Sequence, residues 1–74
     1  MNKDRRNKIS DVIKMLDTTI DKLRDILFEE EMVFDNMPEN LQGSLRGEES
    51  EEAIDIMNEA LDSLQNACDN LSSI

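Results

Sequence analysis

Apolar residues in the first half of the chain recur at alternating steps of three and four positions. This spacing is a heptad repeat, which is typical of a helix that packs along its length against other helices. The repeat predicts one helix over about residues 3–37. Its apolar residues fall into two columns, with Ile13, Ile20, Leu27 and Phe34 in one and Ile9, Leu16, Leu23 and Met37 in the other.

The second half of the chain carries the same repeat over about residues 45–72. Four glutamates gather at the start of this segment, where the positive end of a helix dipole stabilises acidic side chains. Ser44 or Ser50 could be the N-cap, and we expect Ser44, with Glu48 in the first turn. The segment therefore predicts a second helix, whose apolar columns are Ile54, Leu61 and Cys68 in one and Met57, Leu64 and Leu71 in the other.

A polar stretch over about residues 37–45 separates the two segments and holds the only proline of the chain. Pro38 lacks an N–H and disfavours a helical backbone in the residue before it, and Gly43 permits backbone conformations that other residues avoid. We interpret this stretch mechanically, as the turn that ends the first helix and reverses the chain. The alternative is a functional loop with exposed hydrogen-bonding side chains. The residues of this turn motif are Asn36, Pro38, Asn40 and Gln42.

These elements predict an all-α fold, in which residues 1–74 form a single domain as an antiparallel two-helix hairpin. Each helix also carries a third column of apolar or small residues, which a lone hairpin would leave in water. Such an exposed stripe marks an interaction surface. We therefore expect two hairpins to form a four-helix bundle, as a dimer, or a higher even oligomer such as a tetramer. The expected interface residues are Val12, Thr19, Ile26, Val33, Ala53, Ala60 and Ala67.

Three consecutive glutamates, Glu29–Glu31, interrupt the repeat of the first helix. Glu30 stands where the heptad requires an apolar residue. We interpret the run as a point where the helices separate and the helix end is solvated, because runs of charge usually face water. The alternative is an acidic site, formed with Asp35 and Glu39, for a cation or a basic partner. The sequence leaves open whether the helix continues through the run.

The net charge of −10 is unevenly distributed. Residues 1–28 carry seven basic and five acidic side chains, whereas residues 29–74 carry one basic and thirteen acidic ones. The hairpin should therefore have a basic free end and an acidic turn end. Bulk DNA binding is not expected, because neutralising phosphates requires a basic surface. The basic cluster is either a solvated helix start or a set of contacts to an anion such as a nucleotide, and it consists of Lys3, Arg5, Arg6 and Lys8.

The chain lacks the residues of common catalytic sites. It has no histidine, the commonest general base and metal ligand. Its one cysteine, Cys68, lies in an apolar column and is expected to be a buried structural thiol. We therefore expect no enzymatic activity, no cofactor and no metal site. No apolar run approaches the length of a membrane span or of a signal-peptide core, so we expect a soluble cytoplasmic protein that does not bind membranes.

The order of these features resembles a group of small helical proteins of Gram-positive bacteriophages and mobile elements. The resemblance covers nearly the whole chain and rests on the basic start, the run Glu29–Glu31, the segment Phe34–Ser44 and the segment Glu51–Ile54. The group shares the turn motif Phe/Tyr-Asp-Asn-Met/Ile-Pro-Glu-Asn-Leu-Gln. The resemblance implies an accessory protein of a phage or mobile element that acts inside a bacterial host, and it transfers no catalytic residue.

Together these features predict a non-enzymatic, homo-oligomeric binding protein. With the resemblance, they favour an accessory protein that sequesters a host defence component, either a host protein or a small nucleotide signal. The alternative is a structural adaptor or assembly protein that binds another protein through its helical faces.

Overall fold

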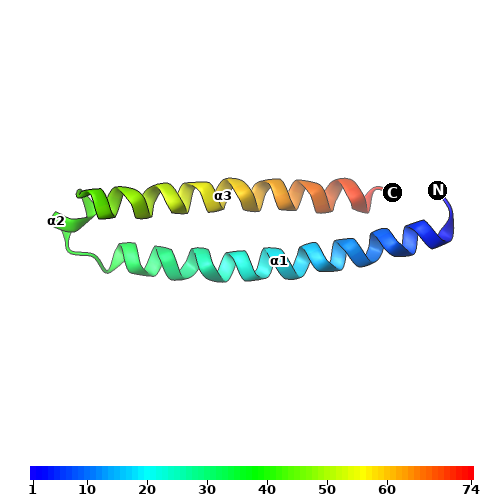
Figure 1. The fold of residues 1–74 in the computed structure, drawn as a ribbon, viewed down its shortest axis with the longest axis horizontal. Helices are drawn as coiled ribbons and strands as arrows, with labels where there is room; N and C mark the ends of the chain where they lie inside the picture. Colours follow the sequence, from blue (N-terminus) through cyan, green and yellow to red (C-terminus); the bar gives the residue numbers. More distant parts are fainter.

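The computed structural model describes all 74 residues and consists of helices α1 (Lys3–Asp35), α2 (Glu39–Gln42) and α3 (Leu45–Ser72). Helices α1 and α3 run antiparallel along each other and form a rod of 58 × 15 × 13 Å (Figure 1). Both chain termini lie at one end of the rod, which we call the open end, and α2 lies at the other, the turn end. The predicted all-α hairpin of two long helices is confirmed.

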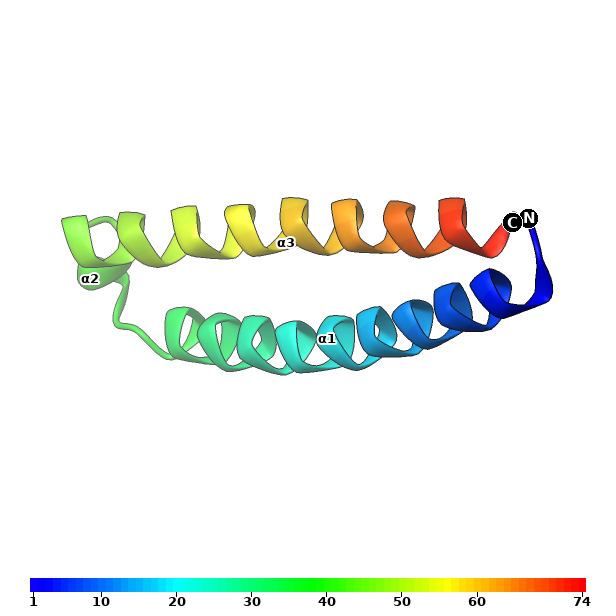
Figure 2. The ribbon, with the colours of Figure 1, turned by 45° about the vertical axis from the view of Figure 1, so that its right-hand side comes forward.

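Helix α1 is continuous through Glu29–Glu31, which the sequence left open. It begins at its predicted position, where the Asn2 side chain accepts a hydrogen bond of 2.9 Å from the Arg5 backbone N–H and so caps the helix. It ends at Asp35 rather than about residue 37, because Pro38 disfavours helical backbone in the residue before it. The helix curves gently, with its convex side away from α3 (Figure 2), as helices that wrap around a core commonly do.

The turn contains one element that the repeat did not predict, the single helical turn α2. Pro38 is the N-cap of α2, and its carbonyl accepts hydrogen bonds from the backbone N–H groups of Leu41 (2.8 Å) and Gln42 (3.1 Å), which close the turn. Helix α3 then starts after Ser44 with Glu48 in its first turn, as predicted. The predicted side-chain cap is wrong, however, because the Ser44 hydroxyl donates to the Leu41 carbonyl instead.

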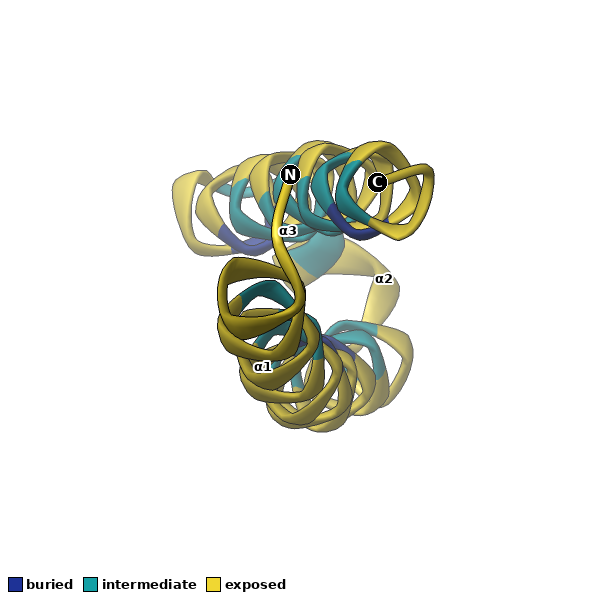
Figure 3. Ribbon diagram, turned by 90° about the vertical axis from the view of Figure 1, so that its right-hand side faces the viewer, coloured by how far each residue is buried: buried dark blue, intermediate teal, exposed yellow.

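The seam between α1 and α3 forms a thin core. The buried apolar residues are Ile20, Leu27 and Cys68, and no side chain is less than 2% exposed. Most other members of the four apolar columns are half-buried. Seen along the rod, the buried and half-buried segments of the two helices face each other and the remaining surface is exposed (Figure 3). A core this thin rarely stabilises a chain of this size without a partner.

Candidate interaction surface

The two long flanks of the hairpin differ in chemistry. In heptad notation, the facing columns occupy positions a and d, beginning at Ile13 and Leu16 in α1 and at Ile54 and Met57 in α3. Position g borders d, and position e borders a. When one helix of a pair is reversed, the order of positions around its helical wheel is also reversed. In an antiparallel pair, both g columns therefore lie on one flank of the seam and both e columns on the other.

Two contacts agree with this assignment of the flanks. The Ser50 hydroxyl donates a 2.7 Å hydrogen bond to the Glu30 carboxylate, which joins two d positions beside the g flank. On the opposite side, the Cys68 thiol at position a lies 3.8 Å from the carboxylate of Asp17 at position e. The g columns of both helices therefore border the same side of the rod.

The g flank is apolar except at its ends, where Arg5 and Arg46 occupy g positions. On α1, Val12, Ile26 and Val33 are 44%, 54% and 50% exposed, and Thr19 is also exposed. On α3, the three predicted interface alanines are half-buried at the edge of the seam. Two apolar side chains in the next columns outward widen the strip, Met15 (68% exposed) and Ile56 (58% exposed). All seven residues predicted for the oligomer interface thus lie on one flank: Val12, Thr19, Ile26, Val33, Ala53, Ala60 and Ala67.

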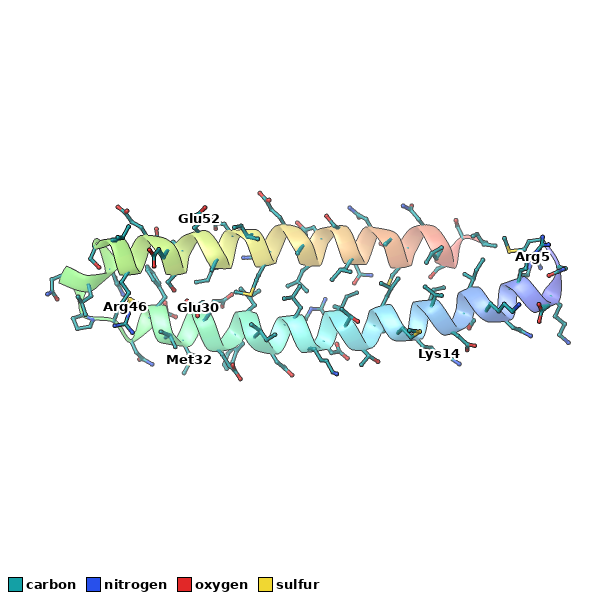
Figure 4. The ribbon with its side chains drawn as sticks, viewed as in Figure 1. Arg5, Lys14, Glu30, Met32, Arg46 and Glu52 are labelled. Atoms are coloured by element: carbon teal, nitrogen blue, oxygen red, sulfur yellow. The ribbon has the colours of Figure 1, made fainter.

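The e flank carries only polar residues. This contrast makes the g flank the side suited to contact with another apolar surface, although Phe28, one column beyond the e flank, is also exposed. Side chains on the outer faces point away from the seam: Lys14 and Met32 point away from α3, and Glu52 points away from α1 (Figure 4). The residues of the e flank are Ser10, Asp17, Arg24, Glu31, Glu51, Asn58, Gln65 and Ser72.

The lone hairpin exposes more surface than its mass warrants. Its accessible surface is 5656 Å², whereas a compact monomer of 8.5 kDa is expected to expose about 4,700 Å². The excess of about 1,000 Å² resembles the roughly 800 Å² that each partner contributes to a standard protein interface. The radius of gyration of the hairpin, 17.1 Å, also exceeds the roughly 11 Å expected for a compact domain of this length.

Glu30 is not the solvated break that the charge run predicted. It is half-buried, points into the space between the helices (Figure 4) and accepts the hydrogen bond of Ser50, which is only 4% exposed. The break is therefore a polar layer inside the seam. Gly47 and Ser50 lie seven residues before Ile54 and Met57, so they continue the two core columns of α3 toward its N-terminus. Extending the heptad in this way would have revealed the polar layer from the sequence.

The turn motif is used mechanically. Gln42 is half-buried, and its side-chain amide donates a 3.1 Å hydrogen bond to the Phe34 carbonyl, which also accepts a 3.1 Å hydrogen bond from the Met37 backbone N–H. The Asn36 backbone N–H closes the last turn of α1 on Met32, Pro38 starts α2, and Asn40 is exposed on α2. Gln42 is therefore not the exposed hydrogen-bonding side chain that the alternative of a functional loop assumed, whereas Asn36 and Asn40 are exposed.

Gly47 explains how closely α2 packs on α3. A Cβ atom added at Gly47 would press on the carbonyl oxygen of Gln42, and it would lie 2.5 Å from the Gln42 carbonyl carbon and 2.6 Å from the Leu41 carbonyl oxygen. Gly47 is buried by this contact. Only glycine permits such an approach of two backbones.

Cys68 is a buried thiol, as predicted, with 4% of its surface exposed. Burial raises the pKa of this thiol above its ordinary value, and the nearby Asp17 carboxylate raises it further, through its charge and through a hydrogen bond, as does the charge of Asp69. The thiol therefore stays protonated at neutral pH. A protonated, buried thiol is a poor nucleophile and metal ligand.

The basic cluster lies exposed at the open end of the rod. Lys8 forms a 3.1 Å ion pair with Asp4 on the same helix, in which both side chains are 74% exposed, so the pair contributes little to stability. Arg6 lines a small groove between the helix ends, together with apolar residues and two serines. The volume of this groove is about 150 Å³, which is below the 300 Å³ or more of typical sites for small organic ligands.

Comparison with known proteins gives no match, because no family model, curated protein or solved structure matches this chain significantly. The resemblance to phage proteins therefore stays a prediction. No group of three or more His, Cys, Asp or Glu side chains is placed so that it could hold a metal ion. None of the helices combines the length and the apolar character that a membrane span requires.

Proposed function

We propose that the protein is a non-enzymatic binding protein that works as a self-associated helical bundle, with the g flank as the contact between two hairpins. One observation carries this proposal: five exposed apolar side chains lie on or beside the g flank, while the e columns opposite are polar and the other exposed apolar residues of α1 and α3, Phe28, Met32 and Leu45, form no continuous strip. Two such flanks, pressed together, make a four-helix bundle.

Contact with a second copy of the chain would remove the apolar side chains of the g flank from water. The half-buried d residues, such as Leu23 and Leu64, open toward the g flank and would become the core of the bundle. The alanines on α3 allow close approach of a neighbouring helix, while the larger side chains on α1 supply apolar area. Isologous contact between identical patches also closes the assembly as a dimer.

A charge on the flank should separate the copies. In Ile26→Glu, a side chain that is 54% exposed in the lone hairpin would place a carboxylate in the bundle core, where burial without a partner is costly. The matched control is Thr18→Glu, which adds the same charge to the exposed outer face of α1. Light scattering coupled to size-exclusion chromatography should give a dimer for the parent and for Thr18→Glu, and a monomer for Ile26→Glu.

Two results would overturn the proposal. One is a monomeric parent at micromolar concentrations. The other is equal dissociation of both variants, because then net charge, and not the g flank, would control association. Circular dichroism checks that each variant remains helical, so that loss of folding is not mistaken for loss of the contact.

The bundle would act by binding, and the resemblance to phage accessory proteins favours sequestration of a host defence component. For a nucleotide signal, the observation in favour is the exposed basic cluster at the open end. Native mass spectrometry of gently purified protein tests this role, because a retained mass of a few hundred daltons would identify a small ligand. A single stoichiometric protein in the complex would instead support the adaptor role.

A further inference from the structure

We propose that the two hairpins pair antiparallel, so that the turn end of each copy lies beside the open end of the other. This inference rests on the proposed self-association and adds its direction. The direction matters because it decides whether the two basic open ends meet. Three independent features of the chain support it: the distribution of charge, the sequence of α1 and the spacing of the alanines on α3.

The charge is concentrated in one half of the rod. The open half, residues 1–19 and 57–74, carries five basic and six acidic side chains, a net charge of −1. The turn half, residues 20–56, carries three basic and twelve acidic side chains, a net charge of −9. Nearly the whole net charge of −10 therefore lies at the turn end.

Parallel pairing would place the two strongly acidic halves side by side. Rods only 15 × 13 Å thick bring many of these charges within the Debye length of about 8–10 Å, at which they still repel. Antiparallel pairing places each acidic half against a half that is almost neutral. Because the apolar strip is available in both arrangements, the charge selects the antiparallel one.

The α1 sequence is self-complementary under this pairing. A two-fold axis across the flank packs each helix against its own copy, and an axis at Thr19, the midpoint of α1, brings together residues whose numbers sum to about 38. Val12 then meets Ile26 of the other copy, Thr19 meets itself, and Val33 meets the side chain of Arg5, whose methylene groups can cover it. At the rim, Lys8 lies level with Glu29 of the other copy, so opposite charges face each other.

The alanines of α3 obey the same axis. Ala53, Ala60 and Ala67 are spaced by seven, so an axis at Ala60 brings Ala53 against Ala67 of the other copy. The Ser50–Glu30 contact places Ala60 level with about Ile20 of α1, and the Cys68–Asp17 contact places it level with about Asp25. The axis required by the alanines therefore lies within about six residues of the axis required by α1.

Spin labels at the turn end measure the direction. Asn36→Cys in a Cys68→Ala background places one label on each hairpin, 17 residues from the axis at Thr19. Antiparallel pairing predicts a label separation of about 50 Å at 1.5 Å per residue. Parallel pairing predicts less than about 25 Å, since neighbouring helices lie about 10 Å apart. If Cys68→Ala fails to fold, Cys68 is retained, because its burial makes it slow to label.

Cross-linking gives a second readout. In the same background, Thr19→Cys should form a disulfide-linked dimer on mild oxidation, while Val33→Cys, far from the axis, should not. The opposite pattern would overturn the antiparallel direction. A dimer by light scattering with a label separation below about 25 Å would also refute the direction alone. A monomer would instead refute the self-association on which it rests.

Discussion

Replacing Gly47 by alanine sets two effects of opposite sign against each other. In an exposed helix, glycine to alanine stabilises by about 1 kcal/mol, because alanine loses less backbone entropy on folding. Gly47 lies in the first turn of α3 and has an ordinary negative φ, so the alanine backbone would be unstrained. Helix propensity alone therefore predicts a more stable protein.

The packing of the turn predicts the reverse. The added Cβ would press on the backbone of Gln42 and Leu41, which cannot move away as a flexible side chain would. Overpacking of this kind costs about 1–3 kcal/mol. Displacing α2 also weakens the 3.1 Å hydrogen bond from Gln42 to the Phe34 carbonyl, which adds about 0.5–1.5 kcal/mol. After subtracting the propensity gain, we expect Gly47→Ala to destabilise by about 0.5–3.5 kcal/mol.

The matched control is Gly43→Ala. Gly43 has a φ of −84°, and no atom lies within 4 Å of the position that a Cβ would take there, so alanine meets neither strain nor a neighbour. It should leave stability unchanged or raise it by about 0.4–1 kcal/mol. Thermal unfolding at one fixed protein concentration compares the two variants, since association shifts Tm. A fall in Tm of about 5–20 °C is expected for Gly47→Ala alone. Equal or greater stability of Gly47→Ala would refute the close packing of α2 on α3.

Two further predictions concern the seam. Ser50→Ala should lower the free energy of unfolding by about 1–2 kcal/mol, because the half-buried Glu30 carboxylate loses its hydrogen bond. The double variant Glu30→Leu, Ser50→Ala should recover most of that loss, as measured by urea unfolding. Equal losses in the single and double variants would contradict this prediction. The raised pKa of Cys68 means that the folded state holds the thiol proton more tightly than the unfolded state. Stability should therefore fall as pH rises above the ordinary thiol pKa of 9.0, and this fall should be absent in Cys68→Ala.

The heptad spacing predicted the fold because a continuous apolar repeat determines both the period and the buried face of a helix. Helix α1 from Lys3, α3 over Leu45–Ser72 and the burial of Cys68 all follow from it. The same columns also identified which residues remain outside the seam. That they lie on one flank follows only when the antiparallel direction is combined with the heptad positions.

The features that the sequence did not reveal involve polar or small residues at core positions. A search for apolar columns passes over Gly47 and Ser50, although both continue the columns of α3. Glu30 was assigned to water because runs of charge usually face water, but Ser50 lies twenty residues away in sequence and supplies a hydrogen bond to its carboxylate. Helix α2 depends on the carbonyl of Pro38, and a single helical turn leaves no periodic signal.

The direction of pairing bears directly on the proposed function. In a parallel dimer, the basic clusters of both copies would adjoin and could surround one anion. In the proposed antiparallel dimer they lie at opposite ends of a rod whose length is 58 Å for one hairpin, and each is neighboured by the acidic turn of the other copy. The groove beside Arg6 is too small to hold a nucleotide alone. Antiparallel pairing therefore favours a macromolecular partner with a basic surface, which would contact the acidic outer face of α3 along the rod, at Glu48, Glu52, Asp55, Glu59 and Asp62.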